Sequence, residues 1–380
     1  MENVKNQFVP RIQKLELAQK IKDNKLVLIQ GPRRVGKKAL VLEVLEDLKA
    51  NYTLFNCNDK KSKKTIENRT VFKNLESDFI VLYEAQYLIN FESIVESILM
   101  GEIRQTTILV CSYIPSMNPE LREAIKQSEL ELNFFAPSFY ESAQHFGLPN
   151  EDKLLEERLI YGSYPEVLSD LEFAEVKLRE IIDEAIFTTF RAGERINKAD
   201  KLIRMLQLLA FSIGETISYN DIAERCGLDN ETVERYIDLL EDAFVLIRLK
   251  SYHNDHRYEL KKANMVYFAD NGIRNVLISN FNPTFLRNDM NQLWKNYLVA
   301  ERIKWMRMNR LDHKVFFWRT HTKQQLDFLE VKETGIVGYK TDWEKRKKVK
   351  FPLSFEEAYP DAKTSPLNRS TYWKFLTQKK

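Results

Sequence analysis

The sequence predicts an α/β fold with a parallel sheet in its N-terminal part. Three apolar runs, at residues 26–29, 79–83 and 106–111, each have the length and character of one buried strand. Segments with helical periodicity alternate with these runs, as in parallel sheets that are covered on both faces. The 380 residues suffice for two or three domains, and 44% hydrophobic residues can fill their cores, so disorder is not expected.

The loop after the first run has the spacing Gly31-x-x-x-x-Gly36-Lys37 of a P-loop, the Walker A motif. Glycines allow turns in which successive backbone N–H groups face a phosphate, and the following helix adds the positive end of its dipole. The Lys37 side chain would reach the β- and γ-phosphates. We therefore expect ATP as the cofactor, bound by the residues of this loop: Gly31, Pro32, Arg33, Arg34, Val35, Gly36, Lys37, Lys38 and Ala39.

Two positions depart from the pattern that holds magnesium beside such a loop. Lys38 stands where a Ser or Thr hydroxyl would bind the ion, and Tyr83 stands where a strand-end aspartate would. Glu84 keeps the position of the glutamate that orients water, so it is the expected catalytic residue. Ser112 ends its strand where a γ-phosphate sensor would lie, although a strand-end serine also commonly forms a turn. The sequence thus predicts ATP binding with a degenerate metal site and weak or lost hydrolysis.

The chain becomes helical after residue 150, and we expect three domains: 1–150, 151–255 and 256–380. Ser218 can begin a helix that Gly227 ends, and Asp229 can begin the next one. With the strand after them, these helices have the pattern of a winged helix. The second helix carries six acidic residues and only Arg235 as a base, which disfavours nucleic acid and favours a structural or protein-contact module.

Composition excludes several other classes of protein. A net charge of +3 indicates no general affinity for nucleic acid, and Cys57, Cys111 and Cys226 lack the spacing of a zinc site or a disulfide framework. No apolar stretch reaches the length of a membrane span, and the N-terminus lacks an apolar signal core. We therefore expect a cytoplasmic protein without a membrane partner or a bound metal.

Several motifs resemble a family of prokaryotic AAA-type ATPases: Phe8-Val-Pro-Arg-Ile, Gln30-Gly-Pro-Arg-Arg-Val-Gly-Lys, Glu84-Ala-Gln, Tyr161-Gly-Ser-Tyr-Pro, Ala269-Asp-Asn-Gly and Trp318-Arg-Thr-His-Thr. They occur in the family's order along nearly the whole chain. The resemblance implies a P-loop domain, a winged-helix segment and a C-terminal domain like a restriction endonuclease, in a family without a defined substrate.

The resemblance also implies where a nuclease site would lie. The helix acid falls on Lys295, the strand acid survives as Asp327, and the Glu-x-Lys pair falls on Lys340 and Asp342 with both charges inverted. The usual metal cage cannot form from these residues, so a DNA-processing nuclease ranks last. Ahead of it stand an ATP-binding pseudoenzyme and, as the alternative, a catalytically silent scaffold for an unidentified protein partner.

Overall fold

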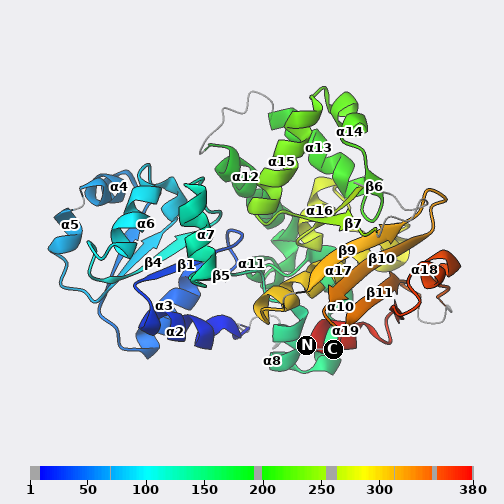
Figure 1. The fold of residues 1–380 in the computed structure, drawn as a ribbon, viewed down its shortest axis with the longest axis horizontal. Helices are drawn as coiled ribbons and strands as arrows, with labels where there is room; N and C mark the ends of the chain where they lie inside the picture. The colour runs from blue at the N-terminus through cyan, green and yellow to red at the C-terminus, as the bar shows by residue number, and fades with distance from the viewer. Residues whose placement is uncertain are drawn as a thin grey trace. The chain divides into compact units, whose positions relative to one another are not determined.

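The computed structural model describes residues 9–68, 70–191, 199–253, 263–311, 313–344 and 349–378 (Figure 1). These form two compact units. The first, here called the P-loop unit, comprises 9–137 and 184–191. The second, the C-terminal unit, comprises 138–183 and 199–378. The helix α12 (Ala174–Arg191) contributes residues to both units.

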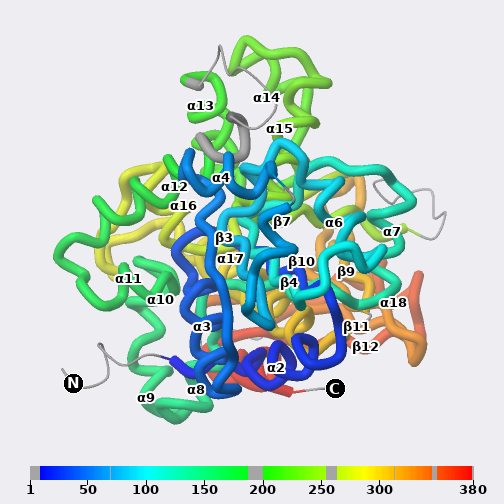
Figure 2. Tube along the Cα trace, turned by 90° about the vertical axis from the view of Figure 1, so that its left-hand side faces the viewer, coloured from blue at the N-terminus to red at the C-terminus, as the bar shows by residue number. Residues whose placement is uncertain are grey.

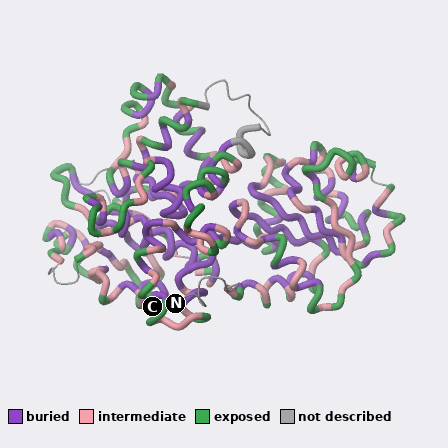
Figure 3. The backbone as a smooth tube through the Cα atoms, turned by 180° about the vertical axis from the view of Figure 1, so that it is seen from behind, coloured by how far each residue is buried: buried purple, intermediate pink, exposed green. Residues whose placement is uncertain are grey.

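A parallel sheet forms the centre of the P-loop unit, with its strands in the order β2-β3-β4-β1-β5. Its strands are β1 (Leu26–Gln30), β2 (Tyr52–Asn56), β3 (Phe79–Tyr83), β4 (Thr106–Cys111) and β5 (Glu131–Asn133). β1 and β4 are buried along their whole length, as Figure 3 shows for the middle of this sheet. The three apolar runs in the sequence therefore form strands, as predicted, and the structure shows that these strands are neighbours.

Helices cover both faces of this sheet (Figure 1). On one face, α2 (Gln13–Asp23) and α3 (Lys37–Asp47) bury apolar side chains such as Leu17 and Leu40. On the other face, a core cluster joins Leu28 and Leu82 of the strands to Ile94 of α6. The helices on this second face are α4 (Lys60–Glu67), α5 (Thr70–Lys73), α6 (Phe91–Leu99) and α7 (Pro119–Gln127), with the short turn η1 (Ala85–Tyr87). Burial on both faces explains why these strands lack polar alternation.

The carboxyl ends of β1, β3 and β4 meet at one edge of the sheet. Gln30 at the end of β1 is paired with Cys111 at the end of β4, and Tyr83 at the end of β3 is paired with Val110. The loop 31–36, Glu84 and Ser112 therefore leave the sheet close together. Ligands of open parallel sheets bind at this edge.

The C-terminal unit contains a mixed sheet in the order β12-β11-β10-β9-β7-β8-β6. Its strands are β6 (Thr216–Ile217), β7 (Leu246–Ser251), β8 (Asn264–Phe268), β9 (Lys314–Arg319), β10 (Gln325–Lys332), β11 (Gly335–Thr341) and β12 (Lys363–Leu367). β7 and β9 pair in parallel through 250–251 and 316–317. The strands of the expected winged helix and of the expected C-terminal domain thus share one sheet.

Helices surround this mixed sheet, and the long helix α17 packs against β8 and β11. α13, α14 and α15 form one group (Figure 2). The helices are α8 (Phe139–Phe146), α9 (Leu148–Lys153), α10 (Leu155–Tyr161), α11 (Pro165–Leu168), α13 (Ala199–Phe211), α14 (Tyr219–Cys226), α15 (Asn230–Asp242), α16 (Asn271–Leu277), α17 (Met290–Met308), α18 (Leu353–Ala358) and α19 (Tyr372–Thr377), with the turns η2 (Leu171–Phe173) and η3 (Thr284–Leu286). No helix among the described residues combines the length and the apolar character needed to cross a membrane.

The expected helix signals at 218–242 are confirmed. Ser218 accepts the N–H of Asp221, and Asp229 accepts the N–H of Thr232, so both residues cap their helices. Gly227 ends α14 in the left-handed conformation at φ 63°. The strand after α15 begins at Leu246 and follows a turn at Phe244, which has φ 59°.

Two of the sequence motifs noted above, 161–165 and 269–272, pack against each other. The Asp270 carboxylate accepts the N–H of Gly272 at 2.8 Å, which caps α16, and the N–H of Ser163 at 2.8 Å. A Cβ atom on Gly162, which has φ 77°, would lie 1.8 Å from this carboxylate. Both motifs therefore have a structural role, since the close approach requires a glycine.

Candidate nucleotide-binding site

The loop between β1 and α3 has the backbone that a phosphate cradle needs. A Cβ atom on Gly31 would lie 1.8 Å from the carbonyl oxygen of Phe134, the residue that follows β5, so only glycine fits here. Gly36 has φ 96° and stands directly before α3, a conformation that side chains rarely adopt. Arg34 adopts a positive φ of 60° without being glycine. The loop thus turns sharply twice and ends at the N-terminus of a helix.

Lys37 is buried beneath this loop. Its side chain is 4% exposed, and its ammonium donates to the carbonyl oxygens of Gly31 at 2.6 Å and Pro32 at 2.5 Å. Burial lowers the pKa of Lys37 from 10.5 to about 8, although the carboxylate of Glu84 opposes this effect. The loop carbonyls therefore accept the hydrogen bonds that phosphate oxygens would otherwise accept from this lysine.

Lys38 and Tyr83, which replace the expected magnesium ligands, lie against each other. The Lys38 ammonium is 5.5 Å from the centroid of the Tyr83 ring, a cation–π contact. Burial, with the nearby Glu84 carboxylate, raises the pKa of Tyr83 to about 12, so its phenol stays neutral. Lys38 itself is exposed on the first turn of α3. The structure therefore brings the two departures together in one place, with an ammonium and a phenol instead of a hydroxyl and a carboxylate.

Glu84 lies at the same edge of the sheet, and its carboxylate is hydrogen-bonded to neighbouring side chains. It is 5% exposed and has a left-handed backbone at φ 57°. Its Oε2 atom accepts from Arg33 at 2.5 Å and from the amide of Gln86 at 2.7 Å. Gln86 in turn accepts the N–H of Ser112 at 3.2 Å. The predicted catalytic glutamate thus belongs to a network that ties the ends of β3 and β4 to the P-loop.

Both arginines of the loop are ion-paired. Arg33 reaches Glu184 at 3.5 Å in addition to Glu84, and Arg34 makes two hydrogen bonds to Glu184, one of them at 3.2 Å from Nε. Glu184 lies on α12, 150 residues from Arg34 in the sequence. No pattern in the sequence signals Glu184, because acidic residues are frequent along that helix. A nucleotide phosphate would compete with this carboxylate for both guanidinium groups.

Arg11 is a second residue that the sequence reasoning did not single out. Its guanidinium donates to the carbonyl of Val35 at 3.1 Å and of Phe135 at 2.6 Å, and it lies 3.8 Å from the centroid of the Phe134 ring. It is 5% exposed. Arg11 therefore joins the P-loop to the segment after β5. The signal was its position in the motif that begins at Phe8, a residue outside the described part of the chain.

The remaining predicted site residues lie in or directly after the same loop. The Pro32 carbonyl faces Lys37, Val35 is buried, and Ala39 is exposed one position after Lys38. Two polar atoms nearby are buried without a hydrogen-bond partner among the described residues, namely Nε of Arg33 and Oγ of Ser112. Buried polar atoms are rarely left unpaired, so both atoms are consistent with a polar ligand at this edge.

The described part of the chain contains no group of three or more His, Cys, Asp or Glu residues that could hold a metal ion. At the P-loop, Glu84 already has two donors on one oxygen, and Glu184 is paired with Arg33 and Arg34. A magnesium ion here would depend on nucleotide phosphates and water for its ligands.

Comparisons with known proteins give the following similarities. Residues 23–143 match the model of the AAA domain family, and residues 152–284 match that of a domain of unknown function (DUF8612). An uncharacterized protein of Haemophilus influenzae is 22% identical over an alignment of 271 residues, and the match covers 65% of this chain and 68% of that protein.

Solved structures are also similar. The Walker-type ATPase PABY2304 of Pyrococcus abyssi has 14% identity and a TM-score of 0.46 over 71% of this chain and 96% of its own. The Holliday junction branch migration motor RuvB of Thermotoga maritima has 17% identity and a TM-score of 0.31 over 65% of this chain and 89% of its own. The match over residues 23–143 agrees with the loop geometry, and together they support an AAA-type P-loop domain, ATPase-like and nucleotide-binding, in this part of the chain.

Proposed function

We propose that the protein binds ATP at the P-loop with little dependence on magnesium and hydrolyses it slowly or not at all. The contact between Lys38 and Tyr83 carries this proposal. One residue offers magnesium a like charge and the other a neutral phenol, so the protein supplies neither of the ligands that usually hold the ion. The nucleotide would be held by Gly31, Gly36 and Lys37, with Pro32, Arg33, Arg34, Val35, Lys38 and Ala39 around its phosphates.

Electrostatics favours Lys38 as a partial substitute for the ion. Two unit positive charges 4 Å apart repel by about 4 kcal/mol at an effective dielectric of 20, and a divalent ion doubles this; solvent screening at the exposed Lys38 reduces the repulsion to a few kcal/mol at most. An ammonium at this place therefore disfavours Mg²⁺ while it attracts the phosphates. Binding without the ion is the consequence.

The state of Glu84 supports slow hydrolysis. A glutamate that orients water needs a free carboxylate oxygen directed at the phosphate. Here Oε2 is shared by Arg33 and Gln86, so this oxygen is kept from a water at the phosphate until the ion pair with Arg33 opens. ATP can open this ion pair by attracting Arg33 to the phosphates. Any residual hydrolysis would then depend on Glu84.

Reverting both departures tests the proposal. We expect the double variant Lys38→Thr, Tyr83→Asp to bind ATP in a magnesium-dependent manner and to gain measurable turnover, because Glu84 is still present. Each single reversion leaves one ligand missing and should change little. The matched control is Lys64→Thr, an exposed lysine on helix α4. A double variant that behaves like the wild type in binding and turnover would count against the proposal.

A second candidate function is a catalytically silent scaffold for a protein partner. One observation favours it, namely the contacts of Lys37. Its ammonium is already satisfied by two loop carbonyls, so the loop is stable without a ligand. Calorimetry separates the candidates: ATP binding that is abolished by Lys37→Ala supports the first, and no binding at millimolar ATP supports the second.

We also retain three finer assignments as proposals. These are a winged helix within 151–255, an endonuclease-like class for 256–380, and a division of the chain at about 150 and 255. Location in the cytoplasm and an unidentified protein partner are proposed with them. The acidic surface of α15, where the side chains of Glu231 and Glu234 lie exposed, supports a protein contact over a nucleic-acid contact.

A further inference from the structure

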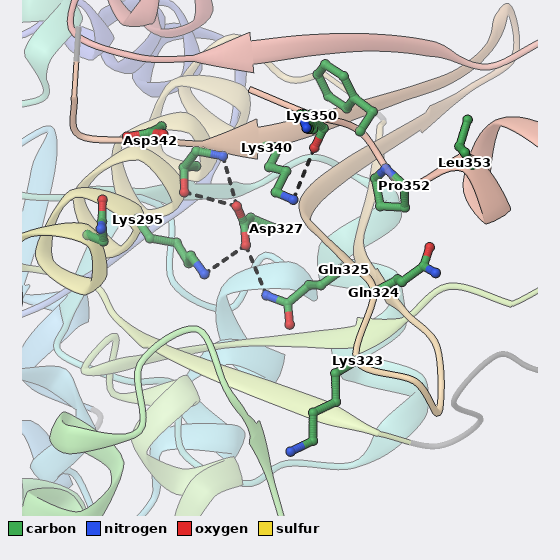
Figure 4. A pocket seen from close by; sticks show the side chains of 13 residues that line it. Lys295, Lys323, Gln324, Gln325, Asp327, Lys340, Asp342, Lys350, Pro352 and Leu353 are labelled. Carbon is green, nitrogen blue, oxygen red and sulfur yellow. Dashed lines mark hydrogen bonds and ion pairs between the residues drawn. The ribbon is translucent and has the colours of Figure 1, made fainter. Parts of the chain in front are cut away.

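A pocket of about 640 Å³ opens in the C-terminal unit, between α17, the strands β10 and β11, and the segment that precedes α18 (Figure 4). It is lined by Lys295, Asp327, Lys340 and Asp342. These are the four positions at which the family resemblance implies the metal-binding and catalytic residues of a nuclease. At three of these positions, Lys295, Lys340 and Asp342, the side chain has the opposite charge to the residue expected in a nuclease. The fold has therefore kept a concave site and changed its electrostatics.

Asp327 is fully engaged by neighbouring donors. Its Oδ1 atom contacts the Lys295 ammonium at 2.7 Å and the Gln325 amide at 3.0 Å. Its Oδ2 atom accepts the N–H of Thr341 at 2.8 Å and the Thr341 hydroxyl at 3.0 Å. The carboxylate is 5% exposed, and the Lys295 ammonium beside it holds its pKa below the usual value. With both oxygens saturated, Asp327 does not offer a ligand to a metal ion.

The remaining charge of the pocket is positive. Four lysines line it against two aspartates: Lys295, Lys323, Lys340 and Lys350 against Asp327 and Asp342. Lys295 is matched by Asp327, and one Asp342 oxygen accepts the N–H of Glu344. Within the described residues, the Lys340 ammonium contacts only a carbonyl, that of Lys350 at 3.2 Å. An ammonium has three donors, so Lys340 has two left for an anion at the pocket wall.

Size and shape indicate more than a simple anion. A volume of about 640 Å³ lies within the usual range for pockets that bind small molecules, whereas a phosphate group alone occupies only a fraction of it. One wall is apolar, formed by Phe351, Pro352 and Leu353, and Leu353 is 71% exposed. Figure 4 shows Lys340 between this wall and Asp327. A ligand with a phosphate at Lys340 and an apolar or planar group along 351–353 fits both surfaces.

We propose that this pocket binds a phosphomonoester of small-molecule size, such as a nucleoside monophosphate, through lysine side chains and without a metal ion. Lys340 contacts the phosphate, and the Lys295–Asp327 pair forms the floor that positions it. Lys323, which also lines the pocket, adds to its positive charge. The same phosphate chemistry also occurs at the 5′ end of a nucleic-acid strand, so the test must include both sources.

The experiment uses the full chain with Lys37→Ala, which removes the P-loop as a competing phosphate site. AMP, adenosine, and a pentanucleotide with or without a 5′-phosphate are titrated by calorimetry in EDTA. We expect AMP to bind, adenosine to bind far more weakly, and Mg²⁺ to add nothing. Lys340→Gln should weaken AMP binding roughly tenfold or more, as expected for the loss of a charge-assisted hydrogen bond. Lys340→Arg, which keeps the charge, should retain binding.

The matched control is Lys363→Gln, an exposed lysine on the neighbouring strand β12, which should leave AMP binding unchanged. Thermal melting verifies that each variant is folded. The same titrations with Lys37 intact give the contribution of Lys340 as a difference, should Lys37→Ala not fold. The proposal is overturned by equal binding of AMP and adenosine, by a requirement for Mg²⁺, or by no effect of Lys340→Gln. Binding of the phosphorylated pentanucleotide without binding of AMP would overturn the small-molecule assignment.

Discussion

The affinity for ATP should fall as the pH rises above 8, because Lys37 must be charged to bind phosphate. Burial lowers the pKa of this side chain from 10.5 to about 8 in the ligand-free protein. A bound triphosphate supplies the negative charge that stabilises the ammonium and returns its pKa to a high value. ATP binding is therefore coupled to proton uptake above pH 8, where an ordinary lysine would show no effect.

The size of the effect follows from the pKa of Lys37. With a pKa of about 8, about a tenth of the lysine is neutral at pH 7 and about nine-tenths at pH 9. The apparent affinity should then be about tenfold lower at pH 9 than at pH 7, which is about 1.4 kcal/mol. At pH 8.5, binding should take up about 0.8 proton.

The stability of the ligand-free protein should change in the opposite direction. Between pH 8 and 10.5 the unfolded chain binds more protons at Lys37 than the folded chain does. The contribution of Lys37 to the free energy of unfolding therefore rises with pH across this window. Saturating ATP should abolish this rise, since it holds the lysine in its charged form.

Calorimetry at pH 7, 8.5 and 9, in buffers with different enthalpies of ionisation, measures affinity and proton uptake together. The control is Lys37→Arg, whose guanidinium stays charged throughout, so any remaining binding should be independent of pH. An affinity that is equal at pH 7 and pH 9, with no dependence on the buffer, would refute the coupling between burial of Lys37 and phosphate binding.

Three further predictions concern other contacts. Glu184→Gln should raise ATP affinity several-fold in calorimetry at low salt, because the loop arginines lose a competing carboxylate; unchanged or weaker binding would argue against competition. Lys295→Met should lower the free energy of unfolding by about 2–4 kcal/mol at pH 7, since Asp327 keeps a buried charge without a partner. The pKa of Asp327 is depressed in the folded wild type, so this difference, measured by urea unfolding, should shrink below about pH 4; a difference that stays constant would contradict the assignment. Gly162→Ala should cost about 3 kcal/mol or more in thermal unfolding, because its methyl group meets the Asp270 carboxylate, and an unchanged melting temperature would contradict that close approach.

Local patterns in the sequence were sufficient to predict most strands of the first sheet and the P-loop. The spacing of Gly31, Gly36 and Lys37 determines a strand, a turn and a helix within a dozen residues, and the structure has all three. The capping residues Ser218 and Asp229 likewise predicted where two helices begin. Such features depend on neighbours in the chain, so one sequence contains the information they need.

Contacts between distant segments could not be predicted in this way. Lys38 and Tyr83 were each recognised as departures, but the cation–π contact between them depends on the pairing of β3 with β4 and of β4 with β1. Glu184 reaches the P-loop from a helix 150 residues away, and nothing in its neighbourhood signals this. The parallel pairing of 250–251 with 316–317, which joins two expected domains in one sheet, is equally non-local.

ATP affinity of the unmodified chain in excess Mg²⁺ and in EDTA tests the central claim most directly. Calorimetry at pH 7 should give two dissociation constants within about threefold of each other, that is, within about 0.7 kcal/mol. Turnover measured on the same samples should be slow or absent. Binding that requires Mg²⁺, or brisk Mg²⁺-dependent hydrolysis that is lost in Glu84→Gln, would contradict the account of Lys38 and Tyr83.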